Sequence, residues 1–194
     1  MTNYIIIGVI AIVVLFVIVF IKMTIDEKKG ANSPEKQKVR DIVRQAVPNS
    51  ETYTIAYGTR EEYAFGGGGR TVTSTTKYWY YGVAFQTGDL YLVPLSIDRG
   101  TISGGQPVHL EKSGLGMADF KNGLLTIYGK DKKELMNLFV TASNTKDDQY
   151  HPVNIQQKEE AASFAQFAEA FARDINAANG ITDLKAAKKE ARKN

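Results

Sequence analysis

An uncharged run at residues 4–21, in which only Tyr4 is at all polar, constrains this chain more than any other feature. At about 1.5 Å per residue, a helix of this length spans roughly 27 Å, close to the bilayer core of about 30 Å. Such a helix is apolar on every side, which disfavours burial in a soluble core. The sequence therefore predicts a transmembrane helix that contacts the lipid bilayer.

A cleaved signal peptide is the main alternative for the same run. Signal peptides carry basic residues before a shorter apolar core and small residues at the cleavage site. No basic residue precedes the run, and Lys22, Met23 and Thr24 after it offer no such site. We therefore expect an uncleaved anchor.

The basic residues near the run all lie on its C-terminal side. Lys22, Lys28 and Lys29 follow it, and no Lys or Arg precedes it. Because basic flanks stay in the cytoplasm, the pattern predicts a single-pass protein of the cell membrane. The domain that follows is expected in the cytoplasm, and an extracytoplasmic position is the alternative.

Composition limits the chemistry of the rest of the chain. There is no cysteine, so disulfides, thiolate metal sites and cysteine nucleophiles are excluded. The formal net charge of +3 is too small to indicate a nucleic-acid partner. The 17 glycines, 10 tyrosines and 9 phenylalanines favour a turn-rich β domain.

A linker and a short helix are predicted within residues 22–50. Ser33 is the expected N-cap, Pro34 the first helical residue and Glu35 an acid in the first turn. Apolar residues then recur at helical spacing, at Val39, Ile42, Val43, Ala46 and Val47. This amphipathic helix is expected to pack on the following domain; the alternative is that its basic face contacts anionic lipid headgroups.

Seven candidate strands begin at residue 51, and their short connections predict antiparallel neighbours. The four glycines at residues 66–69 mark the tip of a first hairpin, and residues 98–106 are expected to form a loop. Asn122-Gly123 predicts a type I′ turn. A second helix over about residues 156–178 is expected to end at Asn179-Gly180, followed by a basic tail at residues 179–194.

This order of elements resembles that of pleckstrin-homology-like domains over residues 51–178. It also resembles uncharacterised single-pass proteins of Gram-positive bacteria that carry such a domain after an N-terminal helix. The resemblance implies an N-terminal transmembrane helix plus an α+β domain, in which a seven-stranded antiparallel barrel or sandwich is closed by a C-terminal amphipathic helix. The apolar stripe of that helix would plug one end of the barrel, through Phe164, Phe167, Phe171 and Ile175.

Lipid-binding members of that family carry a basic motif across the first hairpin. Here Arg60 and Arg70 are separated by Glu61, Glu62 and the glycines. This departure argues against phosphoinositide binding and favours a protein partner. Residues 78–81 are all aromatic and alternate across a strand, so one pair faces away from the barrel interior. The candidate interaction surface therefore consists of Tyr78, Tyr80, Arg60 and Arg70.

No catalytic, cofactor or metal-binding residue is predicted, because no motif for such chemistry is present. The function predicted is a membrane-anchored, non-catalytic binding or scaffold module. One alternative is a membrane-bound hydrolase that uses His109, His151, Asp147 and Asp148; another is an extracytoplasmic ligand-binding domain.

Overall fold

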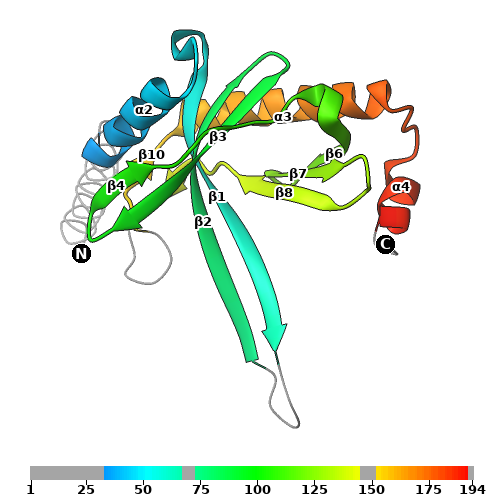
Figure 1. Ribbon diagram of the computed structural model, residues 1–194, viewed down its shortest axis with the longest axis horizontal. Helices are drawn as coiled ribbons and strands as arrows, with labels where there is room; N and C mark the ends of the chain where they lie inside the picture. The colour runs from blue at the N-terminus through cyan, green and yellow to red at the C-terminus, as the bar shows by residue number, and fades with distance from the viewer. Residues whose placement is uncertain (1–32, 67–72, 145–151, 192–194) are drawn as a thin grey trace, which may run out of the picture.

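The computed structural model describes residues 33–66, 73–144 and 152–191 (Figure 1). The helices are α2 (Pro34–Ala46), α3 (Lys158–Ala178) and α4 (Leu184–Ala191), with short 3-10 turns η1 (Ser50–Thr52) and η2 (Lys112–Gly114). The strands are β1 (Thr54–Gly66), β2 (Thr73–Gln86), β3 (Asp89–Asp98), β4 (Thr101–Gly104), β5 (Val108–His109), β6 (Leu115–Lys121), β7 (Leu124–Gly129), β8 (Glu134–Phe139), β9 (Ser143–Asn144) and β10 (Ile155–Gln156).

Helix α2 begins where the sequence predicted. The Ser33 hydroxyl accepts the backbone amide hydrogen of Lys36 at 3.2 Å, and Pro34 occupies the first turn. Val39 and Val43 on its apolar face are buried. On its basic face, Lys36 and Arg40 each lie 2.7 Å from the Glu160 carboxylate at the start of α3. The helix thus packs on the domain, as expected.

The described strands form one large antiparallel sheet and a separate pair. In the large sheet the order is β4-β3-β2-β1-β8-β7-β6, with β5 pairing on β3, while β9 pairs with β10. The longest ladder joins β1 to β2, from Thr54 opposite Phe85 to Gly66 opposite Thr73. This ladder is the predicted first hairpin, and residues 67–72 at its tip lie outside the described part of the chain.

Two tight turns set the ends of short hairpins. Asn122 (φ 53°) and Gly123 (φ 81°) adopt the left-handed backbone that a type I′ turn requires, which confirms that prediction. The loop predicted at residues 98–106 is wrong, because this segment contains β4. There Arg99 (φ 47°) and Gly100 (φ 85°) make a turn of the same hand, which brings Thr101 opposite Asp98. Arginine rarely adopts this backbone, so the sequence did not reveal the turn.

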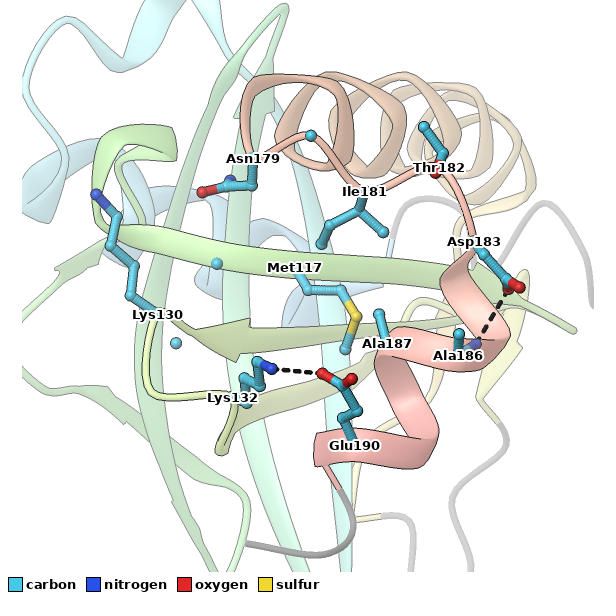
Figure 2. A pocket seen from close by; sticks show the side chains of 13 residues that line it. Met117, Lys130, Lys132, Asn179, Ile181, Thr182, Asp183, Ala186, Ala187 and Glu190 are labelled. Carbon is cyan, nitrogen blue, oxygen red and sulfur yellow. Dashed lines mark hydrogen bonds and ion pairs between the residues drawn. The ribbon is translucent and has the colours of Figure 1, made fainter.

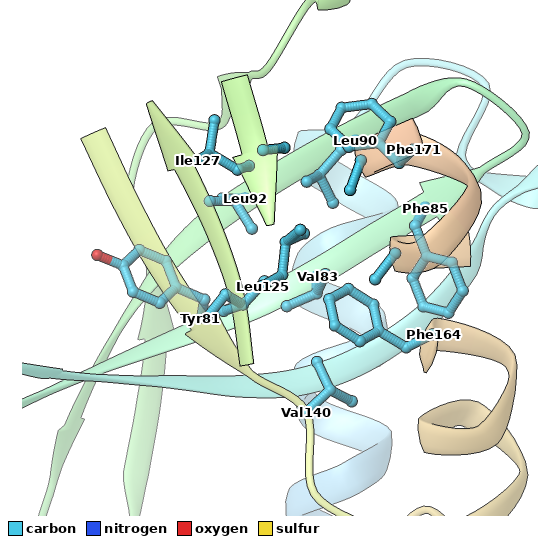
Figure 3. Close-up of a cluster of buried hydrophobic side chains, with 14 of the residues drawn as sticks. Tyr81, Val83, Phe85, Leu90, Leu92, Leu125, Ile127, Val140, Phe164 and Phe171 are labelled. Carbon is cyan, nitrogen blue, oxygen red and sulfur yellow. The ribbon is translucent and has the colours of Figure 1, made fainter. Parts of the chain in front are cut away.

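The main core lies between α3 and the large sheet, where strands β1–β3 and β6–β8 contribute side chains (Figure 3). The phenylalanine stripe of α3 supplies its aromatic centre: Phe164 and Phe171 are each 1% exposed, and Phe85 of β2 packs edge-on against Phe164. Phe167 is only partly buried at the margin. Residues of β6, β7 and β8 enter the same cluster as those of β2 and β3, so the sheet curves around this core.

A second core lies on the opposite face of β1, β2 and β3, beneath α2. Its members are Val39, Val43, Val47, Ile55, Tyr57, Ala84, Val93, Leu95, Ile102, Val153 and Ile155. Glycine lets the helix approach closely: a Cβ at Gly82 would lie 2.3 Å from Cγ2 of Val43, and one at Gly104 would lie 2.3 Å from Cγ2 of Ile42. Both contacts are too short for any side chain to fit without displacement.

The predicted fold class is wrong and is corrected in two respects. First, across residues 33–66, 73–144 and 152–191 there is no helix with the length and apolar character needed to cross a bilayer. The longest, α3, is amphipathic and begins with Lys158, Glu159 and Glu160. The single-pass membrane protein expected from residues 4–21 therefore has no support in the structure, and that segment lies outside the described residues.

Second, the β domain differs from the expected seven-stranded barrel closed by a helix. The Arg99-Gly100 turn adds β4, two-residue pairings add β9 and β10, and the hairpin of β1 and β2 extends well beyond the other strands (Figure 1). The structure is an antiparallel, sheet-rich domain with helices packed on it.

Helix α3 ends close to the predicted stop, where Gly180 has φ 66°. The basic tail then forms α4. Two ion pairs hold it to the sheet: Lys188 to Asp119 at 2.5 Å and Glu190 to Lys132 at 2.6 Å.

Candidate interaction site

The outer half of the β1–β2 hairpin projects away from the helices α2, α3 and α4 and from the remaining strands (Figure 1). We call this part, residues 60–66 of β1 and 73–79 of β2, the ribbon. On β2, pairing with β3 begins at Tyr80 and runs inward. On β1, pairing with β8 is confined to Thr59. Within the described residues, no third strand joins either side of the ribbon.

Side-chain amides cover two strand edges in the body of the domain, one on β6 and one on β1. At β6, the last strand of the sheet, the Asn176 side chain accepts the Ala118 amide hydrogen at 3.0 Å and donates to the Ala118 carbonyl at 2.8 Å. Asn179 donates to the carbonyl of Leu115 at 3.1 Å. These amides occupy the positions that a neighbouring strand would fill, so β6 offers little to a further strand.

A side-chain amide covers the backbone edge of β1 in the same way, at Tyr57 next to the ribbon. The Gln157 side chain accepts the amide hydrogen of Tyr57 at 2.8 Å and donates to the Tyr57 carbonyl at 2.7 Å. It also donates to the carbonyl of Thr141 at 2.9 Å. Gln157 is 1% exposed, so these bonds form in a buried environment. The ribbon contrasts with both of these covered edges.

Charged side chains and an exposed indole share one face of the ribbon, at the end where it joins the body of the domain. Arg60 lies opposite Trp79, and Glu62 lies opposite Lys77. Trp79 is 48% exposed, and its Nε1 donates to the Glu62 carboxylate at 3.3 Å. The Nε of Arg60 is buried and has no hydrogen-bond partner in the described structure. A buried donor of this kind is uncommon, because unsatisfied polar groups are costly.

The predicted interaction residues divide between the two faces. Arg60 is on the face of Trp79, whereas Tyr78 and Tyr80 point to the opposite face, because neighbouring strand residues alternate. Tyr80 stacks on Tyr57 with ring centroids 6.2 Å apart and packs against the second core. Arg70 lies outside the described residues. The predicted surface is therefore not one continuous patch.

The sequence did not reveal that Trp79 is exposed. The alternation in β2 placed Trp79 on the same face as Tyr81, Val83 and Phe85, which are buried in the main core. That face continues outward past the end of the core, so Trp79 is exposed. The sequence does not show how far along the hairpin the pairing with β3 and β8 extends.

His109 belongs to a compact polar cluster elsewhere on the sheet. Its Nε2 lies 2.5 Å from one oxygen of Asp89, and the hydroxyl of Tyr53 donates to the other oxygen. The imidazole stacks on Tyr91 with centroids 4.1 Å apart, and its Nδ1 lies 3.4 Å from Glu111. Each oxygen of Asp89 is thus engaged within the cluster.

The electrostatics of this cluster follow from those contacts. Burial, reinforced by the adjacent Asp89 carboxylate, raises the pKa of Tyr53 to about 12. Burial also acts to raise the pKa of Asp89, but the hydrogen bonds from Tyr53 and His109 prevail and hold it below its ordinary value. Of the residues proposed for a hydrolase, only His109 is described; Asp147, Asp148 and His151 lie outside the described ranges.

A pocket of about 550 Å³ lies where α3 turns into α4 (Figure 2). Met117, Ile181 and Ala187 contribute apolar groups to it. At its rim Lys132 pairs with Glu190 at 2.6 Å, and the Asp183 carboxylate accepts the amide hydrogen of Ala186 at 3.0 Å. Lys132 and Glu190 thus neutralise each other, and a backbone amide of α4 is the partner of Asp183. Within the described ranges, no group of three or more His, Asp or Glu residues is arranged to hold a metal ion.

Comparison with protein-family models, with curated proteins and with solved structures gave no match to this chain. The resemblance to pleckstrin-homology-like domains accordingly receives no support from known proteins. Functional inference therefore depends on the geometry of the chain itself, in which the ribbon is the feature that the packing of the body does not explain.

Proposed function

We propose that this domain is a non-catalytic binding module that recognises a partner protein through the β1–β2 ribbon. The observation that carries this proposal is the contrast between strand edges. Side-chain amides close β6 at Ala118 and β1 at Tyr57, whereas no described strand or helix covers the ribbon.

Strand addition is the interaction that such an edge favours. An extended segment of another chain can pair with the exposed backbone groups of an edge strand, and side chains on alternate positions then provide specificity. A two-stranded ribbon on its own is only marginally stable in water, so a third strand would also stabilise it. Exposed Trp79 supplies an aromatic side chain of the type that anchors protein interfaces.

The cluster around His109 supports a structural role for its polar residues. Asp89 uses both oxygens to hold Tyr53 and His109, and the stacking of His109 on Tyr91 fixes β5 against β3. These contacts tie separate segments of the domain together, in keeping with a rigid body that presents the ribbon.

Shortening the ribbon tests this proposal. Removing residues 61–65 together with their partners 74–78 leaves Arg60 opposite Trp79 and Gly66 opposite Thr73, so the register of the remaining ladder is preserved. We expect a protein recovered in stoichiometric amount with the full chain, measured by affinity purification and quantitative mass spectrometry, to be lost with the shortened chain.

Circular dichroism of the shortened chain should show a folded body, because the removed residues whose side chains the structure describes lie outside both cores. A matched control replaces Lys130, an exposed residue at the opposite end of the sheet, with Ala. Recovery of the same proteins with and without the ribbon, or of no stoichiometric protein with either chain, would contradict the proposal.

A further inference from the structure

Two cations of the ribbon, Arg60 and Lys77, have no acidic partner among the described residues. The Nε of Arg60 is buried without a hydrogen-bond partner, and neither side chain forms an ion pair with a described carboxylate. Glu62 lies opposite Lys77, but its carboxylate accepts the indole hydrogen of Trp79 at 3.3 Å. Apart from Glu61, the other ribbon positions are uncharged in the sequence. The ribbon thus carries positive charge that the domain itself leaves unpaired.

The alternation of strand residues places both cations on the face of Trp79. Neighbouring residues point to opposite faces, so the carboxylate of Glu61 lies on the other face. Arg60 is directly across the ladder from Trp79, where Cβ atoms are about 4.5–5.5 Å apart. Lys77 lies two positions along β2, about 7 Å away. The indole therefore has a cation on each of two sides.

The indole of Trp79 offers a partner its apolar ring rather than a hydrogen bond. Indole has a single N–H donor and no acceptor, and Glu62 already accepts from that donor. The side chain is 48% exposed, so much of the ring is open to contact. Tryptophan and arginine are both enriched among the residues that contribute most to binding at protein interfaces. This face therefore combines an apolar contact with unpaired positive charge.

We infer that the ribbon recognises an acidic segment of a partner protein, in which a carboxylate binds Arg60 and an apolar side chain packs on Trp79. This inference rests on the proposed function, since it gives the chemistry of the partner that the same ribbon binds. The Nε of Arg60 is buried, so the two terminal nitrogens of the guanidinium make the contact with the carboxylate. Lys77 attracts a second acid beside the indole.

The chemistry of this face also predicts a spacing in the partner. In a segment that adds to the ribbon as a further strand, residues two positions apart point to the same face. An acid and an apolar residue separated by one position therefore both reach the face of Trp79. A stacking aromatic between cations also suits single-stranded nucleic acid, but Glu61 and Glu62 would repel its phosphates.

The fluorescence of Trp79 tests this inference directly, because Trp79 is the only tryptophan of the chain. The full chain is titrated with three end-blocked peptides, Thr-Xaa-Thr-Val-Thr-Xaa-Thr, in which Xaa is Glu, Gln or Lys. We expect the glutamate peptide to shift the emission to shorter wavelength and to bind at least about fivefold more tightly than the glutamine peptide. The lysine peptide should bind most weakly, and added salt should reduce the preference.

Equal affinity for the glutamate and glutamine peptides, or no response to any peptide, would overturn the inference. A single-stranded oligothymidylate is titrated in parallel. Tighter binding of the oligothymidylate than of the glutamate peptide would identify a nucleic-acid site instead and would also overturn it.

Charge substitutions locate the contact. Arg60→Gln and Lys77→Gln should each weaken binding of the glutamate peptide at least about threefold. Lys121→Gln removes an exposed lysine at the end of β6 and should leave the affinity unchanged. Arg60→Glu should prefer the lysine peptide, a reversal that loss of folding cannot produce. Unchanged binding by Arg60→Gln, or an unchanged peptide preference in Arg60→Glu, would refute the assigned contact.

The outcomes separate this inference from the proposed function. If the glutamate peptide is not preferred while ribbon shortening still abolishes recovery of a protein, the acidic segment is the wrong partner and the binding function stands. If the glutamate peptide is not preferred and ribbon shortening changes nothing, both proposals fall.

Discussion

The side chain of Gln157 takes the place of a neighbouring strand for Tyr57, accepting its amide hydrogen at 2.8 Å and donating to its carbonyl at 2.7 Å. The residues are 100 positions apart in the chain. This pair joins the N-cap of α3 to β1, two residues before Thr59, where β1 pairs with β8.

Replacing Gln157 with Leu should therefore destabilise the domain by about 3 kcal/mol. The change leaves the buried amide and carbonyl of Tyr57 without partners, and each unsatisfied group costs about 1–3 kcal/mol. Urea unfolding followed by far-ultraviolet circular dichroism measures the change, because Trp79 is exposed and makes a poor fluorescent probe. Gln156→Leu, which removes an exposed bond to Ser143, should alter stability by less than about 0.5 kcal/mol; equal effects would refute the assigned role of Gln157.

Close approach of α2 makes Gly82 intolerant of any side chain. A Cβ there would lie 2.3 Å from Cγ2 of Val43, so Gly82→Ala should cost about 1–3 kcal/mol through overpacking. Val43→Ala in the same chain removes the clashing methyl groups, and the double variant should lose less stability than the sum of the single changes. Gly114→Ala is the matched control, because nothing lies within 4 Å of the added Cβ. Additive losses in the double variant would place α2 elsewhere.

The phenylalanines of α3 should differ in importance according to their burial. Phe171 is 1% exposed, so Phe171→Ala should cost about 3–5 kcal/mol. Phe167 is only partly buried, so Phe167→Ala should cost about 1–2 kcal/mol. Thermal and urea unfolding of both variants provide the comparison, and a larger loss for Phe167 would be inconsistent with the observed packing.

Stability should fall in acid through Glu160. Partial burial acts to raise the pKa of this carboxyl, but the hydrogen bond from Lys36 and the charges of Lys36 and Arg40 prevail and hold it below its ordinary 4.5. A lowered native pKa means that the ion pair contributes fully above pH 4.5 and is lost as the pH falls through the native value.

Glu160→Gln should accordingly lower the free energy of unfolding by about 1–3 kcal/mol at pH 7. Its difference from the natural chain should shrink towards zero at pH 3 and below. Urea titrations at both pH values measure this, with Glu159→Gln, at the exposed neighbouring residue, as the control. A difference that is the same at pH 7 and in acid would exclude the ion pair as its source.

Local features of the fold were predictable from the sequence. The cap at Ser33 and the turn at Asn122-Gly123 depend on residues three or fewer positions apart, so their chemistry is visible in a short window. The periodic phenylalanines of α3 likewise identified the helix face that is buried. In each case the residue types themselves carry the conformational preference.

Features set by distant segments were not predictable. The turn at Arg99-Gly100 places arginine in a backbone conformation that its type does not indicate. The exposure of Trp79 depends on where the pairing between β2 and β3 ends. The edge of β6 is covered at Ala118 by Asn176, which is 58 positions away in the chain. Alternation assigns a residue to one face of a strand, but tertiary packing decides whether that face is covered.

The partnership of α2 with α3 has a consequence for how the domain is made. Arg40 meets Glu160 across 120 positions, Lys36 pairs with the same carboxylate, and Tyr57 on the edge of β1 needs Gln157 as its partner. During synthesis, the first helix and the central strand leave the ribosome long before the groups that complete them. The domain therefore cannot reach its final packing on a growing chain until α3 has emerged, and a chain that stops short of it would release an incomplete sheet edge to the cell.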